Sequence, residues 1–393
     1  MNQTEEQRLK AAGPLQGTTI LDLANETASF TTRLLCDLGA LVIRVEPPGT
    51  EPEDMTFLYH NAGKKRITLN LEREEGRQLL LQLAQQADVM LETFAPGYLT
   101  ARGITYERLC RENHGLILVS VTGFGLNGRR CDEKSNDLTL SAWGGAMFVS
   151  GEAGRPPLRM LGSQTEYTAS LYAAISVILA LMERRNTGHG RHIDLSTQET
   201  VVSALDHVLP RYLYQDVVAK RQGSLAWHKG SFLLPCVDGE LLVNLSAAQW
   251  DTLVEWVDGE GLAADLAEPQ WKDETFRQAH VEHIIQVLSH WTGSHTVKEM
   301  FEIAQLMHFA WTPVVRPEDV LSSPQMLERG GRDFETTTGR RIPTPGMPYR
   351  SKAFPIRVSE RLAQSGEQNE ELYCGVLHLT PEELERMRKE RLI

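Results

Sequence analysis

The sequence lacks the residue spacings that mark disulfide frameworks and metal centres. Its five cysteines, an odd number, are widely spaced and form no C-x-x-C pair, and its twelve histidines form neither an H-x-x-x-H nor an H-E-x-x-H motif. These absences argue against a disulfide scaffold and against the common zinc sites. We therefore expect reduced, structural thiols and no metal.

An excess of positive charge and an apolar leader are also missing. The formal charge is -12 at pH 7, which argues against a nucleic acid or an anionic membrane as a partner. The N-terminal "MNQTEEQRLKAAG" has no apolar stretch, and the longest apolar helix, near 168–182, is shorter than the ~20 residues that span a bilayer. A cytoplasmic protein is expected.

Repeats and low-complexity tracts are absent, and the remaining composition is that of a globular protein. Hydrophobic residues make up 41% and charged residues 23% of the 393 positions, unlike the composition of disordered chains. Because single cores stop growing at about 250–300 residues, this length predicts two domains.

Strand and helix patterns alternate through the first half of the chain. Helical patterns such as "EEGRQLLLQLAQQA" (74–87) lie between short β-rich runs. Since parallel strands need crossover connections, the alternation predicts a parallel sheet with helices on both faces. The strand runs are "TTILDLA" (18–24), "LVIRVEPPG" (41–49), "RITLNL" (66–71), "DVMLETF" (88–94) and "HGLILVSVTGFG" (114–125).

The predicted fold class is α/β, with a Rossmann-like large domain and a smaller α/β domain. A long helix rich in small residues follows from Glu166 to Arg185, then a strand at 191–196 and a further helix at 197–215. The pattern changes near "QGSLAWHKG" (222–230). We assign residues 1–205 and 331–393 to the large domain, 206–224 to a linker and 225–330 to the small domain.

Three short features suggest binding chemistry, and each also has an ordinary structural explanation. "GFGLNG" (123–128) matches a dinucleotide fingerprint, but "RRCDEKSND" after it is polar and turn-like rather than helical. "TGHGRH" and "AWHKG" have no Ser or Cys at the spacing of a hydrolytic triad. Basic residues near predicted strand ends suit a phosphorylated ligand together, although each alone could be solvated surface charge: Arg44, Lys64, Lys65, Arg66, Arg129, Arg130 and Lys134.

Stretches in a fixed order over nearly the whole chain resemble the family III CoA-transferases, the formyl-CoA transferase and carnitine-CoA transferase group. The group also includes α-methylacyl-CoA racemases. The matching stretches include "LLCDLGALVIRVEPPG", "NAGKKRITLNLEREEGRQLL", "ADVMLETFAPGYL", "SNDLTLSAWGGAM", "LYAAISVILALMERRNTGHGRHIDLS" and "TPVVRPEDVLSSPQMLERGG".

The resemblance implies an enzyme that exchanges CoA between an acyl-CoA and a free carboxylic acid, without a covalently bound cofactor. It also implies an interlocked dimer, two chains threaded like links, with CoA held by the Rossmann-like domain. In the family an Asp attacks the thioester and forms a mixed anhydride, then a CoA thioester of its own carboxyl group. Of the family's CoA contacts, Lys64 and Lys134 are retained here, and Arg44, Lys65 and Arg66 could compensate for phosphate contacts that are lost.

Glu166 occupies the position of the family's catalytic Asp, and one residue is lost between it and the preceding Gly162. The longer side chain could partly offset the shorter loop. However, a misplacement of about 1 Å can lower a rate by ~100-fold. Glu166 is therefore either the nucleophile or the remnant of one.

Several other positions of the family's site also differ. A racemase of this family would need a His directly before Asp137, but Asn136 stands there. Because a neutral amide does not transfer protons at pH 7, we do not expect racemase activity. The remaining differences lie in the loops around the site: Thr27, Ser29, Phe30, Pro47, Thr93 and Ala101 stand where the family has other residues.

We therefore expect a CoA-transferase subunit with a degenerate nucleophile site that works in a hetero-oligomer with a homologous, Asp-bearing chain. The two-subunit benzylsuccinate-type CoA-transferases of the family are a precedent, and succinyl-CoA is a candidate donor. One alternative is an active homodimer that uses Glu166. A second is a non-catalytic scaffold protein that binds CoA esters. Trp227 and His228 are expected in a substrate lid, although a structural loop is an equal alternative.

Overall fold

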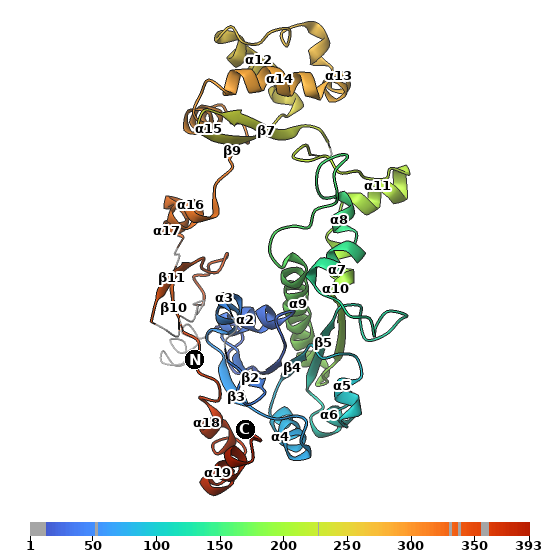
Figure 1. Ribbon diagram of the computed structural model, residues 1–393, viewed down its shortest axis with the longest axis vertical. Helices are drawn as coiled ribbons and strands as arrows, with labels where there is room; N and C mark the ends of the chain where they lie inside the picture. Colours follow the sequence, from blue (N-terminus) through green and yellow to red (C-terminus); the bar gives the residue numbers. More distant parts are fainter. Residues whose placement is uncertain (1–12, 52–53, 227, 330–331, 337–338, 355–360) are drawn as a thin grey trace. The chain divides into compact units, whose positions relative to one another are not determined.

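The computed structural model describes residues 13–51, 54–226, 228–329, 332–336, 339–354 and 361–393 (Figure 1). The chain divides into two compact units. The first consists of Met1–Ala146, Arg159–Gln215 and Pro324–Ile393, and the second of Met147–Leu158 and Asp216–Ser323.

A parallel sheet forms the centre of the first unit, as predicted. Its six strands follow the order β3-β2-β1-β4-β5-β6, which is the strand order of Rossmann folds, and the order reverses between β1 and β4. The strands are β1 (Thr19–Leu23), β2 (Leu41–Glu46), β3 (Lys65–Thr68), β4 (Val89–Glu92), β5 (Ile117–Thr122) and β6 (His192–Ser196).

Helices cover both faces of this sheet because alternate strand residues point to opposite sides. Ile20 and Val42 face one apolar core with α2 (Ser29–Asp37) and α9 (Gln164–Thr187), whereas Leu21 and Ile43 face the other. Helix α4 (Glu74–Gln85) and α6 (Tyr106–Glu112) complete that second core (Figure 1). The continuous apolar strands in the sequence reflect this burial on both sides.

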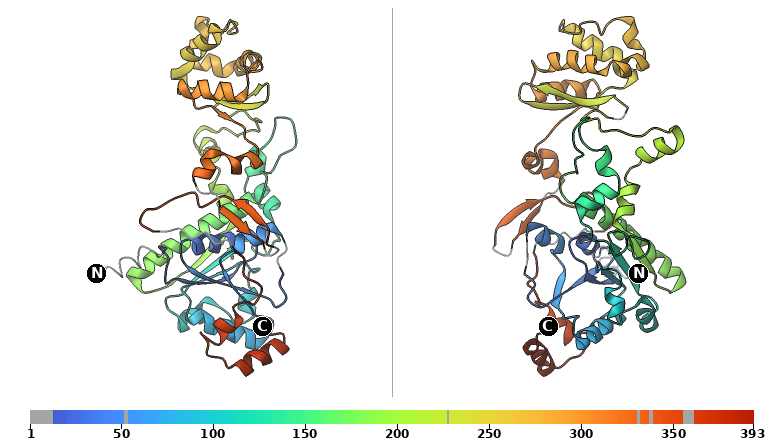
Figure 2. Two further views of the ribbon diagram at one scale, coloured as in Figure 1. Left: turned by 90° about the vertical axis from the view of Figure 1, so that its left-hand side faces the viewer. Right: turned by 45° about the vertical axis from the view of Figure 1, so that its right-hand side comes forward.

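Helix α9 is longer than the sequence predicts, with 24 residues. Its small residues Ala169 and Ala173 are fully buried and allow close packing on the sheet and on α2. In the described part of the chain, α9 alone is long and apolar enough to cross a bilayer by length and composition. The core helix of a soluble protein passes the same test, and Figure 2 shows α9 lying along the sheet.

The single helix predicted over 197–215 is wrong. The structure has two helices, α10 (Thr197–Ser203) and α11 (Val208–Gln215). Pro210 lies in the first turn of α11, where its missing N–H does no harm, but in one continuous helix it would remove an internal hydrogen bond. The Asp206 carboxylate also accepts a hydrogen bond from the His207 N–H at 2.8 Å, which competes with helix formation.

Residues from the end of the chain cover β3, one of the two edge strands of this sheet. The N–H of Thr68 donates to Asn369 Oδ1 at 2.9 Å, and the N–H of Asn70 donates to the Leu392 carbonyl at 2.8 Å. This segment carries α18 (Asn369–Tyr373) and α19 (Pro381–Lys389), and Thr380 caps α19 as the sequence suggests. An antiparallel pair, β10 (Arg332–Glu335) and β11 (Arg341–Thr344), precedes it.

Short helices connect the strands of the first unit. They are α3 (Met55–Asn61), α5 (Tyr98–Ala101), α7 (Asp137–Trp143) and α17 (Pro324–Glu328), while α8 (Ala146–Val149) begins where the first segment of the unit ends.

The second unit is a small α/β body with its own core. An antiparallel sheet of β7 (Ser231–Cys236), β8 (Gly239–Asn244) and β9 (Thr312–Pro313) packs with helices around buried tryptophans, among them Trp250 and Trp291. The helices are η1 (Ala247–Gln249), α12 (Trp250–Gly259), η2 (Pro269–Lys272), α13 (Glu274–Ala279), α14 (Val281–Thr292), α15 (Val297–Leu306) and α16 (Pro317–Ser322).

The two units differ from the predicted domains at three places. Residues 147–158, which we assigned to the large domain, group with the second unit. Helix α11 belongs to the first unit, although a linker was expected there. The first unit resumes at Pro324 rather than at residue 331.

Candidate active site

The carboxyl edge of the sheet, at the point where its strand order reverses, is where open α/β sheets bind ligands. The loop after β1 and the loop after β4 meet there, because the N–H of Asn25 donates to Thr93 Oγ1 at 2.8 Å. Both loops contain positions that differ from the family pattern, which places these differences side by side.

Glu166 lies in the first turn of α9, two residues into the helix, and is half-buried. Burial raises the pKa of this carboxyl group. The nearby carboxylates of Asp137 and Glu26 raise the pKa further, and a hydrogen bond with the Ser163 side chain opposes the rise.

Asp137, at the start of α7, is fully engaged by its neighbours. Its Oδ1 accepts hydrogen bonds from the backbone N–H and the hydroxyl of Thr165, at 3.1 and 2.8 Å, and its Oδ2 pairs with Arg159 at 2.8 Å. This carboxylate ties the beginning of α7 to the beginning of α9. It therefore fixes the first turn of α9, which carries Glu166.

Four rings lie together at Tyr167, the residue that follows Glu166. Phe30 from α2 packs edge-to-face on Tyr167 from α9, with 4.9 Å between ring centroids. It also lies 5.2 Å from His60 and 6.2 Å from Tyr59, both from α3. Tyr167 follows Glu166 directly, and the Glu166 charge contributes to the raised pKa of Tyr167, after burial and Tyr59. Phe30, one of the positions that differ from the family, is thus packed inside this aromatic cluster.

A line of hydrogen bonds crosses this aromatic cluster. His60 Nδ1 lies 3.1 Å from Ser29 Oγ, and His60 Nε2 lies 3.1 Å from the Tyr167 hydroxyl. Burial, together with the positive charges of Lys64 and Arg33, lowers the pKa of His60 to about 4. The ring is therefore neutral at pH 7 and holds the aromatic cluster together.

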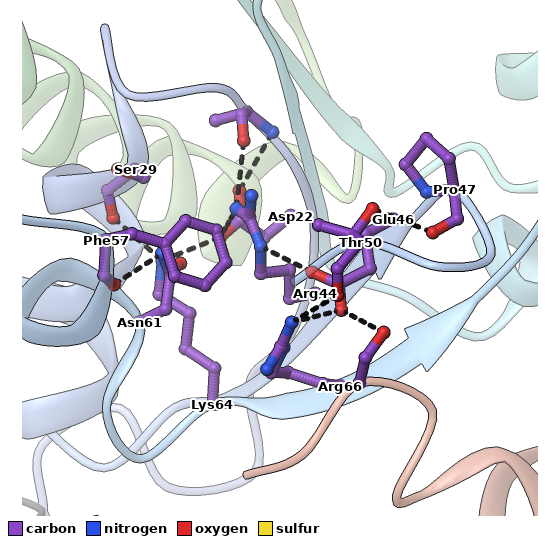
Figure 3. A network of polar contacts seen from close by, with 12 residues as sticks. Asp22, Ser29, Arg44, Glu46, Pro47, Thr50, Phe57, Asn61, Lys64 and Arg66 are labelled. Atoms are coloured by element: carbon purple, nitrogen blue, oxygen red, sulfur yellow. Dashed lines mark hydrogen bonds and ion pairs between the residues drawn. The ribbon is translucent and has the colours of Figure 1, made fainter. Parts of the chain in front are cut away.

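A buried network of alternating charges lies across β1, β2 and β3 (Figure 3). Lys64 pairs with Asp22 at 2.8 Å, and Arg44 lies between Asp22 at 3.8 Å and Glu46 at 3.1 Å. Glu46 also pairs with Arg66 at 2.6 Å. The strand register places Asp22 beside Arg44 and Arg44 beside Arg66. Three positive and two negative side chains thus stabilise one another away from water.

Lys64 and Arg44 were predicted to contact the phosphates of a ligand, but both lie in the interior of the protein. The Lys64 ammonium donates to Asp22, to the Ser29 carbonyl and to Asn61 Oδ1, each at 2.8 Å, so all three of its protons are used. Arg44 is 7% exposed, and its guanidinium lies over the Phe57 ring, with 5.0 Å to the centroid. In this structure both residues are interior structural groups rather than contacts for CoA.

The remaining predicted basic contacts lie nearer the surface. Lys65 pairs with Glu371. Lys134 is exposed and has no ion pair with any residue that the structure describes.

The "GFGLNG" loop opens no helix, because α7 begins only at Asp137, and the Leu126 N–H donates instead to Asp194 at 2.9 Å. These contacts give the dinucleotide interpretation no support.

The predicted lid lies in the second unit. Trp227 lies outside the described residues. His228 is exposed, and its Nδ1 accepts a hydrogen bond from the Gly230 N–H at 3.0 Å.

Sequence reasoning missed the aromatic cluster and the role of Asp22. "FLYHN" (57–61) is a polar and aromatic run of a kind that occurs on many helix surfaces, and nothing in it indicates Tyr167 as a partner. The one available signal was Asp22 itself, a carboxylate inside the apolar strand "TILDL", because a buried acid needs a cation.

Comparison with known proteins identifies the class as a transferase that uses CoA thioesters as substrates, without a bound cofactor. The chain belongs to CoA-transferase family III, whose family model matches residues 15–369.

Three similar proteins illustrate the match. Subunit BbsE of the succinyl-CoA:(R)-benzylsuccinate CoA-transferase of Thauera aromatica is 30% identical over 91% of this chain and 93% of its own length. The beta subunit of the succinyl-CoA–L-malate CoA-transferase of Chloroflexus aurantiacus is 28% identical over 97% and 98%. A CAIB/BAIF family protein from Brucella suis superposes with a TM-score of 0.83 at 26% identity, covering 93% and 99%.

Proposed function

We propose that this chain is the subunit of a hetero-oligomeric CoA-transferase that does not supply the nucleophile. A homologous chain with an Asp at the equivalent position is its partner. The complex transfers CoA from succinyl-CoA to a free carboxylic acid.

The surroundings of Glu166 are the observation that carries this proposal. A carboxylate nucleophile must be ionised and must reach the thioester carbon. Burial and two neighbouring carboxylates disfavour the charged form of Glu166, and no lysine or arginine among the described residues forms an ion pair with it. Phe30, from α2, packs against Tyr167, the residue that follows Glu166. The environment therefore suits a packed, inactive position better than a reacting one.

The chemistry assigned to the partner's Asp proceeds in balanced steps. The carboxylate attacks the succinyl-CoA carbonyl and expels the CoA thiolate, which leaves a mixed anhydride. The thiolate attacks the Asp carbonyl of this anhydride, so that succinate leaves and an aspartyl-CoA thioester remains. The acceptor carboxylate then attacks the aspartyl-CoA thioester and expels the CoA thiolate, which gives a second mixed anhydride. The thiolate attacks the acceptor carbonyl of this anhydride, so that the CoA thioester of the acceptor is formed and the Asp carboxylate is regenerated.

An exposed apolar stripe on α9 supports association with a second chain. Leu171, Ile175, Leu179 and Met182 are each at least half exposed, and they recur every three or four residues, so they share one face of the helix. A contiguous apolar face of this kind usually marks an interaction surface. The names of the relatives agree with this role, since one is a subunit and another is the beta subunit of a two-subunit enzyme.

Lys134 is our proposed contact for the phosphates of CoA. It is exposed and lies just before α7, which begins at Asp137. Lys65, partly exposed beside Glu371, is a second proposed contact.

The decisive experiment measures CoA transfer from succinyl-CoA to a panel of carboxylic acids. This chain is purified alone and also together with a co-expressed Asp-bearing homologue. We expect activity only in the pair. Replacing the partner's catalytic Asp with Asn should abolish turnover, whereas Glu166→Gln should leave it within about threefold, because Glu166 takes no part in the covalent steps.

Glu107→Gln, at an exposed position on α6, is the matched control for the change in charge. Turnover by this chain alone, with loss of activity in Glu166→Gln and trapping of a glutamyl derivative by hydroxylamine, would establish the active homodimer instead.

A further inference from the structure

The second unit contains a cavity of about 200 Å³, which corresponds to the volume of roughly seven water molecules. It lies between the loop that leads into β7, the residues that follow β8, and helices α13 and α14. Its lining includes Lys229, Leu245, Glu274, Arg277, Val281 and Ile284.

Arg277 is a buried cation in the wall of this cavity, with only 9% of its surface exposed. Its Nη1 donates to the carbonyl oxygens of Trp271 and Lys272 at 2.7 and 2.9 Å, and the guanidinium lies 4.9 Å from the centroid of the Trp250 ring. None of these groups carries a full negative charge. Among the described residues no carboxylate forms an ion pair with Arg277. The Asp273 carboxylate caps α13 by accepting a hydrogen bond from the Phe276 N–H, and this bond and, less strongly, the Arg277 charge lower the pKa of Asp273. A buried charge without a directly bonded counter-charge is unfavourable.

Lys229 brings a second cation to the same cavity. Its ammonium donates to the Gln278 carbonyl at 3.0 Å, which fastens the loop to α13. The Lys229 backbone has a φ of 56°, a left-handed conformation that is strained for a residue with a side chain. No ion pair of Lys229 occurs in the described part of the chain either.

The other lining residues define the kind of molecule that fits. Glu274 is the one acidic residue of the lining, and its Oε1 accepts a hydrogen bond from Gln278 Nε2 at 3.2 Å. The cavity wall therefore has a net positive charge. Leu245, Val281 and Ile284 supply an apolar wall, which inorganic phosphate would not need.

We propose that this cavity binds a small carboxylic acid with a short hydrocarbon body. The carboxylate lies against Arg277 and Lys229, because the planar guanidinium fork matches the two oxygens of a carboxylate. The hydrocarbon body packs against Leu245, Val281 and Ile284. This binding site lies within the second unit and does not depend on which residue carries out CoA transfer.

The test titrates the full chain with butyrate, succinate and inorganic phosphate, using calorimetry and the melting temperature as measurements. We expect at least one carboxylate to bind and to raise the melting temperature, and phosphate to bind more weakly. Lys229→Met should weaken carboxylate binding about tenfold, because one charged hydrogen bond is lost. Lys298→Met, at an exposed lysine of α15 outside the cavity, should leave the affinity unchanged.

Arg277→Lys provides a second test, since it keeps the positive charge and removes the planar guanidinium group that matches the two carboxylate oxygens. Its circular dichroism and melting curve report whether the variant folds, and we expect a folded protein whose affinity falls about tenfold or more. Absence of binding by both carboxylates up to roughly 10 mM, an affinity too weak to be specific, would overturn the proposal. Equal binding of phosphate, or an equal loss in Lys298→Met, would also overturn it.

Discussion

The ammonium nitrogen of Lys64 lies 2.8 Å from Oδ2 of Asp22, and both side chains are completely shielded from solvent. Asp22 comes from β1 and Lys64 immediately precedes β3, so the pair joins the centre of the sheet to its edge. Burial of this kind is favourable only while both partners are present.

Lys64→Met should lower the free energy of unfolding by about 3–5 kcal/mol, because it leaves the Asp22 carboxylate buried without its cation. Urea denaturation of the purified chain measures this loss. Lys298→Met is the exposed control, and the double variant Asp22→Asn, Lys64→Met should recover part of the stability. A loss below about 1 kcal/mol, the range of exposed pairs, would contradict the structural role.

The stability of the protein should fall as the pH is lowered from 6.5 toward 4. The pKa of His60 is lowered from 6.5 to about 4 by burial, with Lys64 and Arg33 contributing. Across this window the unfolded chain binds a proton that the folded chain does not, so acid favours unfolding, by up to about 3 kcal/mol for this group.

Urea denaturation at a series of pH values checks this dependence. His60→Gln should flatten the curve between pH 4 and 6.5, whereas His290→Gln, at an exposed histidine of α14, should not. Identical slopes in the wild type and in His60→Gln would show that other groups cause the acid sensitivity.

Tyr167→Phe should destabilise the fold by about 1 kcal/mol, because it removes the hydroxyl that bonds the buried Nε2 of His60. The free energy of unfolding measures the loss, and the imidazole resonances of His60 should shift in NMR spectra. The matched control is Tyr172→Phe, a partly exposed tyrosine of the same helix. If the two variants are equally stable, the hydrogen bond contributes nothing.

Charges placed on the apolar stripe of α9 should abolish association. Ile175→Glu and Leu179→Glu each put a carboxylate where the proposed partner packs, and burial of an unpaired charge is strongly unfavourable. Analytical ultracentrifugation should then show a smaller species. Gln82→Glu, at an exposed position of α4, should leave the assembly intact, and unchanged assembly in all three variants would place the interface elsewhere.

The parallel sheet could be predicted from the sequence because each of its strands is a short apolar run bounded by turns. The alternation of strands and helices then required parallel crossovers. The break between α10 and α11 also had a signal in the sequence, since Pro210 lies in the interior of the predicted helix 197–215, but the apolar periodicity continues past it and led to the prediction of one helix. The residue boundaries of the two units also differ from the predicted ones, because they depend on contacts between segments that are distant in the sequence.

Glu166 could be assigned to the family's nucleophile position because the flanking stretch matches a family pattern, and this assignment stays a prediction. Its electrostatic environment could not, since Asp137 and Glu26 lie far from it in the sequence. For the same reason Lys64 and Arg44 suggested a phosphate site, although their partners are interior carboxylates. A basic residue in a sequence does not reveal whether its counter-charge belongs to a ligand or to the protein.

The covering of β3 by residues near the end of the chain has a consequence during protein synthesis. Thr68 and Asn369 are separated by 301 residues, which a ribosome adds in roughly 15–60 s at 5–20 residues per second. For that time the nascent sheet has an open edge that could pair with another chain. The strand is only four residues long and begins with Lys65 and Arg66, two features that limit aggregation while the covering segment is still being made.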